Sequence, residues 1–226
     1  MRLRRESVSW REEAKKRAAL EAVKHVKNGF VLGLGSGSTA AYAIREMGRR
    51  IKQESLRILG VPTSYQALLV AVDCGIPLTT LNEHPQLDLT IDGADQIDGS
   101  LNLIKGMGGA LTREKIVASA SKQLIIVVDE TKLVERLGTN HPVPVEVLPF
   151  ALPTIMFKVR EMGGKPVLRE GKGKVGPVVT DNGNFIIDVD FGPVSTPKEL
   201  DSLLKSVSGV IETGLFVEMA DIIYVG

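Results

Sequence analysis

The stretch that decides the fold runs from Leu89-Thr-Ile-Asp-Gly-Ala-Asp-Gln-Ile-Asp98 through Gly99-Ser-Leu-Asn-Leu-Ile104 to Lys105-Gly-Met-Gly-Gly-Ala-Leu-Thr-Arg-Glu-Lys115. Its apolar runs over 87–91 and 101–104 predict two short, buried strands that are neighbours. The glycine cluster after the second run leads into a helix, because glycine lets a loop turn sharply before the helix begins. This order of strands, turns and helix predicts an open α/β sheet.

Charged side chains follow each of these predicted elements: Asp92, Asp95 and Asp98 after the first strand, Lys105 after the second, and Glu114 in the first helical turn. Ligands bind at the carboxyl ends of the strands in open α/β sheets, so we expect these groups to meet at one site. Buried carboxylates beside a lysine suit proton transfer next to a developing negative charge. The ordinary alternative is that Asp-Gly pairs only form turns and Glu114 only stabilises a helix N-terminus, by about 0.3–1 kcal/mol. Because charged residues follow the second predicted strand as well as the first, within a few residues, a functional site is favoured over isolated turns.

A second motif, Gly35-Ser-Gly-Ser-Thr39, follows a predicted strand over 30–34 and opens an alanine-rich helix. A helix start offers N–H groups and the positive end of the helix dipole, and the hydroxyls add donors, so this turn suits an anion. A dinucleotide site is not indicated, because Ser38 stands where the fingerprint requires glycine and no acid ends the next strand at 56–61. A P-loop would require a following Gly-Lys-Ser/Thr, which is absent. We therefore expect a monophosphate here.

The later part of the chain predicts a second, smaller unit. Prolines cluster after Leu137, and the elements that follow have the order β-α-β-β-α-β, which is ferredoxin-like. The pair Asn182-Gly183 predicts a hairpin turn between strands over 178–181 and 185–189.

The remaining local patterns complete the predicted architecture. The capping box Ser9-Trp-Arg-Glu12 predicts the start of the first helix. The run 77–81 predicts a strand, and the run 222–225 predicts a strand that returns to the main sheet. The predicted fold class is α/β, a Rossmann-like doubly wound sheet with a second, smaller α+β (ferredoxin-like) domain. We expect a catalytic domain over 1–137 plus 208–226, and a lid or oligomerisation domain over 138–207.

Composition excludes several classes of protein. The 28 basic and 27 acidic side chains among 226 residues nearly cancel, which argues against general binding of nucleic acid or anionic membranes. No apolar run approaches the roughly 18 residues that a bilayer span requires, and the N-terminus lacks the apolar region of a signal peptide. The single cysteine, Cys74, excludes an intramolecular disulfide and fits a reducing compartment. A cytoplasmic protein is expected.

The histidines give no indication of a metal site. His25, His84 and His141 are scattered, and no spacing of His, Cys and Asp resembles a set of metal ligands. We therefore expect neither a metal nor another cofactor.

Three motifs together resemble the type A ribose-5-phosphate isomerases. They are Asp92-Gly-Ala-Asp-Gln-Ile-Asp98 with Lys105-Gly-Met-Gly-Gly-Ala-Leu-Thr-Arg-Glu-Lys-Ile116, then Gly33-Leu-Gly-Ser-Gly-Ser-Thr39, and Pro142-Val-Pro-Val-Glu-Val147. The resemblance covers nearly the whole chain, with the motifs in the same order. Met107 stands where many members have glycine, but the glycines on either side are intact.

The resemblance implies reversible conversion of D-ribose 5-phosphate to D-ribulose 5-phosphate. This reaction moves a proton between C2 and C1 through an enediolate and needs no cofactor. By resemblance, Glu114 is the base, and Asp92 and Asp95 handle the sugar hydroxyls and assist ring opening. Lys105 stabilises the enediolate oxygen together with neighbouring amides. The residues that the resemblance assigns to substrate binding are Lys15, Ser36, Gly37, Ser38, Thr39, Gly93, Ala94, Gly106, Met107, Gly108 and Lys132.

Two alternatives stay open on the sequence. An amino-sugar phosphate deaminase on a related scaffold would be expected to carry a catalytic histidine, and no histidine lies near the central motif. A non-catalytic sugar-phosphate sensor would need a DNA-binding domain before it, and only eight residues precede Ser9. The expected partners are a small sugar phosphate and further copies of the chain, because the family forms homodimers or homotetramers; no nucleic acid and no membrane is expected.

Overall fold

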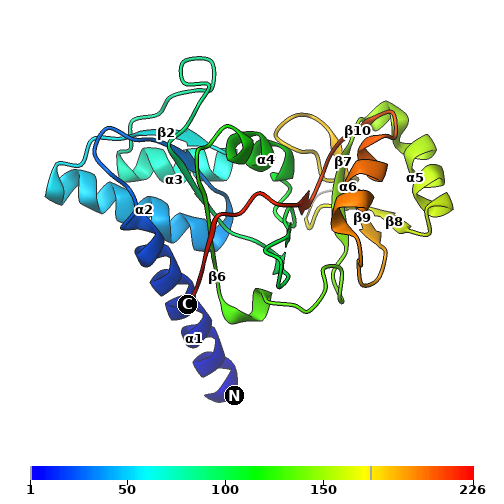
Figure 1. Cartoon of the computed structure of the whole chain (residues 1–226), viewed down its shortest axis with the longest axis horizontal. Helices are drawn as coiled ribbons and strands as arrows, with labels where there is room; N and C mark the ends of the chain where they lie inside the picture. Colours follow the sequence, from blue (N-terminus) through cyan, green and yellow to red (C-terminus); the bar gives the residue numbers. More distant parts are fainter. Residues whose placement is uncertain (1, 174) are drawn as a thin grey trace. The chain divides into compact units, whose positions relative to one another are not determined.

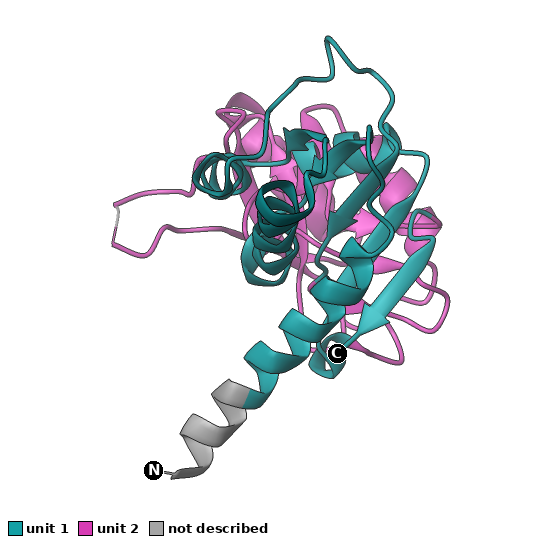
Figure 2. Cartoon of the chain, turned by 90° about the vertical axis from the view of Figure 1, so that its left-hand side faces the viewer, with its two compact units in different colours: residues 1–94, 113–132, 219–226 teal, residues 95–112, 133–218 magenta. Residues whose placement is uncertain are grey.

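The structure is a computed structural model that describes residues 2–173 and 175–226, with side chains described from residue 10 onward. The chain forms two compact units, coloured separately in Figure 2. Unit 1 comprises Met1–Ala94, Arg113–Lys132 and Met219–Gly226, and unit 2 comprises Asp95–Thr112 and Leu133–Glu218.

Unit 1 is built around a parallel five-stranded sheet with the order β12-β6-β3-β1-β2. Both β3 and β6 are buried along their whole length, as expected for parallel strands covered on both faces. The sheet confirms the predicted Rossmann-like fold, including the return of the last strand beside β6. The strands are β1 (Val31–Leu34), β2 (Leu59–Pro62), β3 (Leu89–Asp92), β6 (Leu124–Val128) and β12 (Ile222–Val225).

Three helices of unit 1, α1 (Arg2–Val23), α2 (Gly37–Glu54) and α3 (Tyr65–Cys74), pack against one another and the sheet. In Figure 1, α1 lies beside the C-terminal end of the chain, and α1 packs against β12. Since α1 begins at Arg2, the prediction that Ser9 caps its start is wrong. None of the helices in the described part of the chain combines the length and apolar character that a bilayer crossing requires. The core of this unit includes Ala18, Ala22, Leu32, Leu34, Ile44, Met47, Ile91 and Ile125.

Unit 2 contains an antiparallel four-stranded sheet with the order β10-β7-β9-β8. Its elements follow one another as β7, α5, β8, β9, α6 and β10, so the predicted β-α-β-β-α-β order is confirmed. Apolar side chains such as Val145, Ile155, Ile187 and Leu204 form its core. The elements are β7 (Val143–Val147), α5 (Leu152–Glu161), β8 (Lys165–Leu168), β9 (Phe185–Asp190), α6 (Pro197–Lys205) and β10 (Val210–Thr213).

A three-stranded antiparallel sheet, β11-β5-β4, also belongs to unit 2. It joins β4 (Gln96–Ile97), β5 (Leu103–Ile104) and β11 (Leu215–Phe216). The prediction that the strands over 87–91 and 101–104 are neighbours is therefore wrong, because β3 pairs with β1 and β6 whereas β5 pairs with β4 and β11.

The catalytic domain over 1–137 plus 208–226 and the lid or oligomerisation domain over 138–207 stay a prediction. By compactness alone, residues 95–112 and 133–218 group in unit 2, where β11 pairs with β5.

Two predicted strands are reduced to isolated bridges. In the run 77–81, Leu78 forms a single parallel bridge with Gly60. In the predicted hairpin, Val179 forms one antiparallel bridge with Phe185, so the chain after Asn182-Gly183 becomes β9 but the chain before it is not a strand. In each of these two segments the backbone pairs with another segment at one residue, so a continuous strand does not form.

Candidate functional site

The predicted site residues of unit 1 follow three adjacent strands, β6, β3 and β1, of the parallel sheet. Ser36–Thr39 follow β1, Asp92 ends β3, and Lys132 follows β6. The carboxyl ends of parallel strands share one edge, and the strand order reverses between β1 and β3, so these residues lie at the topological switch point.

Asp92 is held at this point by the backbone of the neighbouring turn. Its side chain is buried, with the residue 1% exposed. Its Oδ1 accepts the N–H of Ser36 at 3.0 Å and that of Gly93 at 2.7 Å. A Cβ on Gly35 would lie 2.3 Å from this oxygen, so only glycine lets the turn approach the carboxylate. The motif after β1 and the motif after β3 thus form one structure.

The turn after β1 is also fixed from the start of α3. The Ser36 hydroxyl lies 2.8 Å from the Thr63 hydroxyl and donates to the Ser64 hydroxyl at 2.6 Å. Ser64 in turn caps α3 by accepting the N–H of Ala67 at 3.1 Å. The side chain of Gln66 accepts the N–H of Gly37 at 2.9 Å. These contacts support the turn after β1. The sequence analysis did not predict this supporting role for Thr63-Ser-Tyr-Gln66.

The N-terminus of α2 is suited to an anion. Ser36 precedes the helix in an extended conformation, and its side chain makes no capping hydrogen bond within the described structure. The ammonium group of Lys15, from α1, lies 3.4 Å from the Ser38 hydroxyl. A positive charge beside the positive end of a helix dipole is the electrostatic setting of a phosphate site.

Lys15 is oriented by an acid on its own helix. Its Nζ donates to Glu12 at 2.8 Å, and the Tyr42 hydroxyl donates to the other oxygen of that carboxylate at 2.8 Å. The hydrogen bonds from Lys15 and Tyr42 lower the pKa of Glu12, so the carboxylate stays charged and keeps the lysine at the start of α2.

Glu114 and Lys132, also predicted residues of unit 1, lie on helices. Glu114 stands in the first turn of α4 (Leu111–Ser119) and is 5% exposed. Lys132 ends the short helix η1 (Glu130–Lys132), and its N–H donates to the carbonyl of Asp129 at 3.1 Å. Thus Glu114 is a buried carboxylate, and Lys132 is a partly exposed cation at the end of β6.

Unit 2 carries the predicted residues Asp95, Lys105 and Gly106–Gly108. The N–H of Met107 donates to Oδ2 of Asp95 at 3.0 Å, so the acid holds the glycine-rich loop. Lys105 is 3% exposed, and its Nζ lies 5.4 Å from the centroid of the Phe216 ring, within cation–π range. The third acid, Asp98, has a structural role, since its carboxylate accepts the N–H groups of Ser100 and Asn102, both at 2.9 Å.

Sequence reasoning missed Arg169, which follows β8. Its Nη1 donates to the carbonyl oxygens of Gly106 at 2.8 Å and Met107 at 3.0 Å. Its Nε donates to Asp188 at 2.8 Å, and its Nη2 donates to the other oxygen of the same carboxylate. No local pattern marks an arginine at the end of an ordinary strand, so only the fold shows this contact.

Glu146 of the third motif was also without a predicted role. It is fully buried on β7, and its Oε2 accepts the hydroxyl of Thr112 at 2.6 Å. Its Oε1 accepts the Thr180 hydroxyl at 2.9 Å and the side-chain amide of Asn184 at 2.8 Å. These donors satisfy a buried charge. They join β7 to the first turn of α4 and to the turn before β9.

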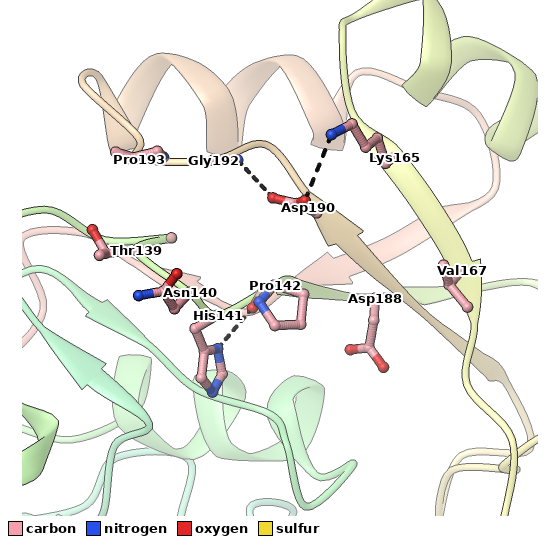
Figure 3. Close-up of a pocket in the computed structure, with 11 residues that line it drawn as sticks. Thr139, Asn140, His141, Pro142, Lys165, Val167, Asp188, Asp190, Gly192 and Pro193 are labelled. Carbon is pink, nitrogen blue, oxygen red and sulfur yellow. Dashed lines mark hydrogen bonds and ion pairs between the residues drawn. The ribbon is translucent and has the colours of Figure 1, made fainter.

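A pocket of about 460 Å³ in unit 2 is lined by none of the predicted site residues (Figure 3). In it, the ring Nδ1 of His141 lies 2.9 Å from the carbonyl oxygen of Pro142. Asp190 accepts the N–H of Gly192 at 2.8 Å and lies 4.0 Å from Lys165. His141 and Asp190 thus contact backbone groups of neighbouring residues, and Lys165 forms an ion pair with Asp190. Among the described residues, no group of His, Cys, Asp or Glu is arranged to hold a metal ion.

Comparisons with known proteins agree on one family. The model of a family described as ribose 5-phosphate isomerase A (phosphoriboisomerase A) matches residues 59–226. The ribose-5-phosphate isomerase A of Methanosarcina acetivorans is 51% identical over 212 residues, which cover 94% of this chain and 89% of the relative.

Solved structures give the same result. One from Methanocaldococcus jannaschii, described as ribose 5-phosphate isomerase A, has a TM-score of 0.92 at 47% identity and covers 95% of each chain. A D-ribose-5-phosphate isomerase in complex with phospho-erythronic acid has a TM-score of 0.93 at 46% identity, covering 96% of this chain and 95% of its own.

Proposed function

Because the chain belongs to the ribose 5-phosphate isomerase A family, we propose that it interconverts D-ribose 5-phosphate and D-ribulose 5-phosphate. The observation that carries this function is the contact of Ser36 with Asp92, which joins an anion-binding turn to a buried acid. A sugar phosphate needs both features, one for the phosphate and one for the reacting end. Neither a deaminase nor a sensor is supported by any of the relatives described above.

The proton transfer is assigned to Glu114. An aldose–ketose isomerase moves a proton between C2 and C1, and this needs one base over these two carbons. Glu114 is a buried carboxylate in the first turn of α4. The first turn of the helix fixes the position from which this carboxylate can act. Triosephosphate isomerase, a worked example of the same class of reaction, also uses a glutamate base.

Asp92 and Asp95 are assigned to the sugar hydroxyls and to ring opening. Ring opening moves a proton from the anomeric hydroxyl to the ring oxygen, so it needs acid–base groups apart from the base at C1 and C2. Each carboxylate keeps one oxygen occupied by backbone N–H groups of neighbouring turns. That contact fixes its direction. Gly93 and Ala94, between the two acids, complete this part of the substrate contact.

Stabilisation of the enediolate is assigned to Lys105 and to the amides of Gly106, Met107 and Gly108. The negative charge develops on oxygen during the reaction, and fixed donors in a site without water stabilise it most strongly. The Lys105 side chain is buried, with its ammonium group over the Phe216 ring. It therefore supplies a positive charge that is removed from bulk water.

The phosphate is assigned to the start of α2. Ser36, Gly37, Ser38 and Thr39 provide N–H and hydroxyl donors, and Lys15 lies beside Ser38. Lys132 adds a second cation. The relative solved with phospho-erythronic acid binds a phosphorylated sugar acid, which is the chemistry that this constellation would recognise. We place the protein in the cytoplasm as a homodimer or homotetramer.

The test is an isomerase assay on purified protein. Ribose 5-phosphate in the presence of EDTA should yield ribulose 5-phosphate, measured by absorbance or a coupled enzyme, since no residue in the proposed mechanism requires a metal. Phospho-erythronic acid should inhibit in competition with substrate. Absence of ribulose 5-phosphate at high enzyme concentration would contradict the function. Activity that EDTA abolishes and one divalent ion restores would contradict the metal-free mechanism.

A further inference from the structure

The guanidinium group of Arg169 makes contacts with the backbone of the loop after β5. Its Nη1 bridges the carbonyl oxygens of Gly106 and Met107, at 2.8 and 3.0 Å. The opposite side of the guanidinium group is bound to both carboxylate oxygens of Asp188 on β9. A planar group held on two sides in this way has little freedom to rotate.

These two contacts fix the direction of the loop's amide groups. In a trans peptide the C=O and the N–H point in opposite directions, and the described residues contain no cis peptide. The carbonyl of Gly106 shares its peptide plane with the N–H of Met107, which points to Asp95 at 3.0 Å. The carbonyl of Met107 shares its plane with the N–H of Gly108. Arg169 therefore turns both N–H groups away from itself.

The loop needs such a clamp because of its composition. Gly106, Gly108 and Gly109 have wide conformational freedom, and Gly106 has a φ of +104°, which other residues rarely adopt. Electrostatic stabilisation of a transition state depends on donors that are already oriented before the charge develops. Within the loop, the N–H of Gly109 donates to the carbonyl of Gly106 at 3.0 Å. That bond does not bind the carbonyl of Met107, whose peptide plane carries the N–H of Gly108.

We propose that Arg169, anchored by Asp188, is a positioning residue that orients the amide of Gly108 for the enediolate and keeps the amide of Met107 on Asp95. The inference rests on the function proposed above. Arg169 touches no reacting atom in this account. It acts through the peptide groups whose carbonyls it binds, and its positive charge also polarises them and strengthens their N–H groups as donors.

The test compares Arg169→Lys, Arg169→Met and Asp188→Asn with the wild type and with Arg160→Met. Arg160 is an exposed arginine of the same unit, on α5, and serves as the surface control. Lysine keeps the charge but cannot bind two carbonyls and a carboxylate in one plane. Both Arg169 variants should lower kcat by at least about tenfold, since loss of an oriented oxyanion donor costs about 10²–10³. KM for ribose 5-phosphate should stay within about threefold, because the phosphate contacts lie elsewhere.

Two further readouts separate positioning from simple destabilisation. The inhibition constant of phospho-erythronic acid should rise with the fall in kcat, because its planar carboxylate carries negative charge on oxygen, as the planar enediolate does. Asp188→Asn should also lower kcat, but by a smaller factor than the Arg169 variants. Combining it with Arg169→Met should cause no further loss, because the residues act as one unit.

A variant of Arg169 with kcat within twofold of wild type would overturn the inference, whatever its melting temperature. So would a rise in KM with unchanged kcat. Where Arg169→Met does not fold, Arg169→Lys and Asp188→Asn carry the same test. A wild type without isomerase activity would contradict the proposed function itself, which is a different result from active enzyme that tolerates these substitutions.

Discussion

The backbone N–H of Ser36 donates to the buried carboxylate of Asp92 over 3.0 Å, although the two residues are 56 positions apart. Ser36 follows β1, and Asp92 ends the adjacent parallel strand β3; the strand order reverses between these two strands. The turn proposed to bind phosphate and the acid proposed to act on the sugar are therefore parts of one structure. A change in the acid is expected to affect both stability and phosphate binding.

Asp92→Ala and Asp92→Asn should separate these effects. Alanine removes the acceptor for the N–H groups of Ser36 and Gly93, and each buried donor left unpaired costs about 1–3 kcal/mol. Asparagine keeps an acceptor oxygen but loses the charge. We expect a clear loss of melting temperature and a raised KM for alanine only, and a loss of kcat for both. Equal melting temperatures for alanine and wild type would show that these contacts contribute nothing.

Thr39→Val tests the phosphate turn. Thr39 lies in the first turn of α2, and valine has the same shape without the hydroxyl. Loss of a hydrogen bond to a charged group costs about 1.5–3 kcal/mol, so KM for ribose 5-phosphate should rise roughly 10- to 150-fold. Thr39→Ser keeps the hydroxyl and should leave KM close to wild type. An unchanged KM in the valine variant would place the phosphate elsewhere.

Elements with a clear apolar pattern could be predicted from the sequence. The strands predicted over 222–225 and 30–34 are observed as Ile222–Val225 and Val31–Leu34, because a run of apolar residues between turns leaves few alternatives. Gln96–Ile97 and Leu215–Phe216 could not be predicted as strands. Two residues carry no periodic pattern, and these strands exist only because chain segments far apart in the sequence pair with one another.

The same contrast holds for the candidate site. Its acids, Lys105 and the turn proposed to bind an anion could be proposed from the sequence, because each lies in a recognisable local motif. Arg169 and the role of Glu146 could not, because their partners are distant in sequence: the loop at Gly106 and the hydroxyl of Thr112. Side chains that support a site are recognised by their contacts in the folded structure, and these contacts leave no pattern in the local sequence.

The pH dependence of stability should depend in part on Asp88, just before β3. Lys122 donates to its Oδ1 at 2.8 Å and the N–H of Val31 to its Oδ2 at 2.9 Å. The hydrogen bond from Lys122, followed by that from Val31, lowers the pKa of Asp88 below its ordinary value of 3.8. A lowered pKa in the folded state means that the charged form contributes stability above the unfolded pKa and loses it as the pH falls through the folded pKa.

The measurement is urea unfolding of wild type and Asp88→Asn at a series of pH values. Wild type should be the more stable at neutral pH, and the difference should shrink as the pH falls below about 4. Lys122→Met, which leaves the bond from Val31 in place, should show a smaller dependence on pH. A difference between wild type and Asp88→Asn that stays constant across this range would contradict the assignment.

The central claim is that Glu114 moves the proton, and Glu114→Gln tests it most directly. Glutamine keeps the shape and can form hydrogen bonds, but it cannot accept a proton at neutral pH. We predict that kcat falls by at least about 10²–10⁴-fold, which is the usual contribution of a positioned base. KM and the melting temperature should stay nearly unchanged. Wild type should also incorporate solvent deuterium at C1 or C2 during turnover, and the variant should not. A kcat within a few-fold of wild type, measured on a folded preparation, would remove Glu114 from the mechanism and leave Asp92 or Asp95 as the base.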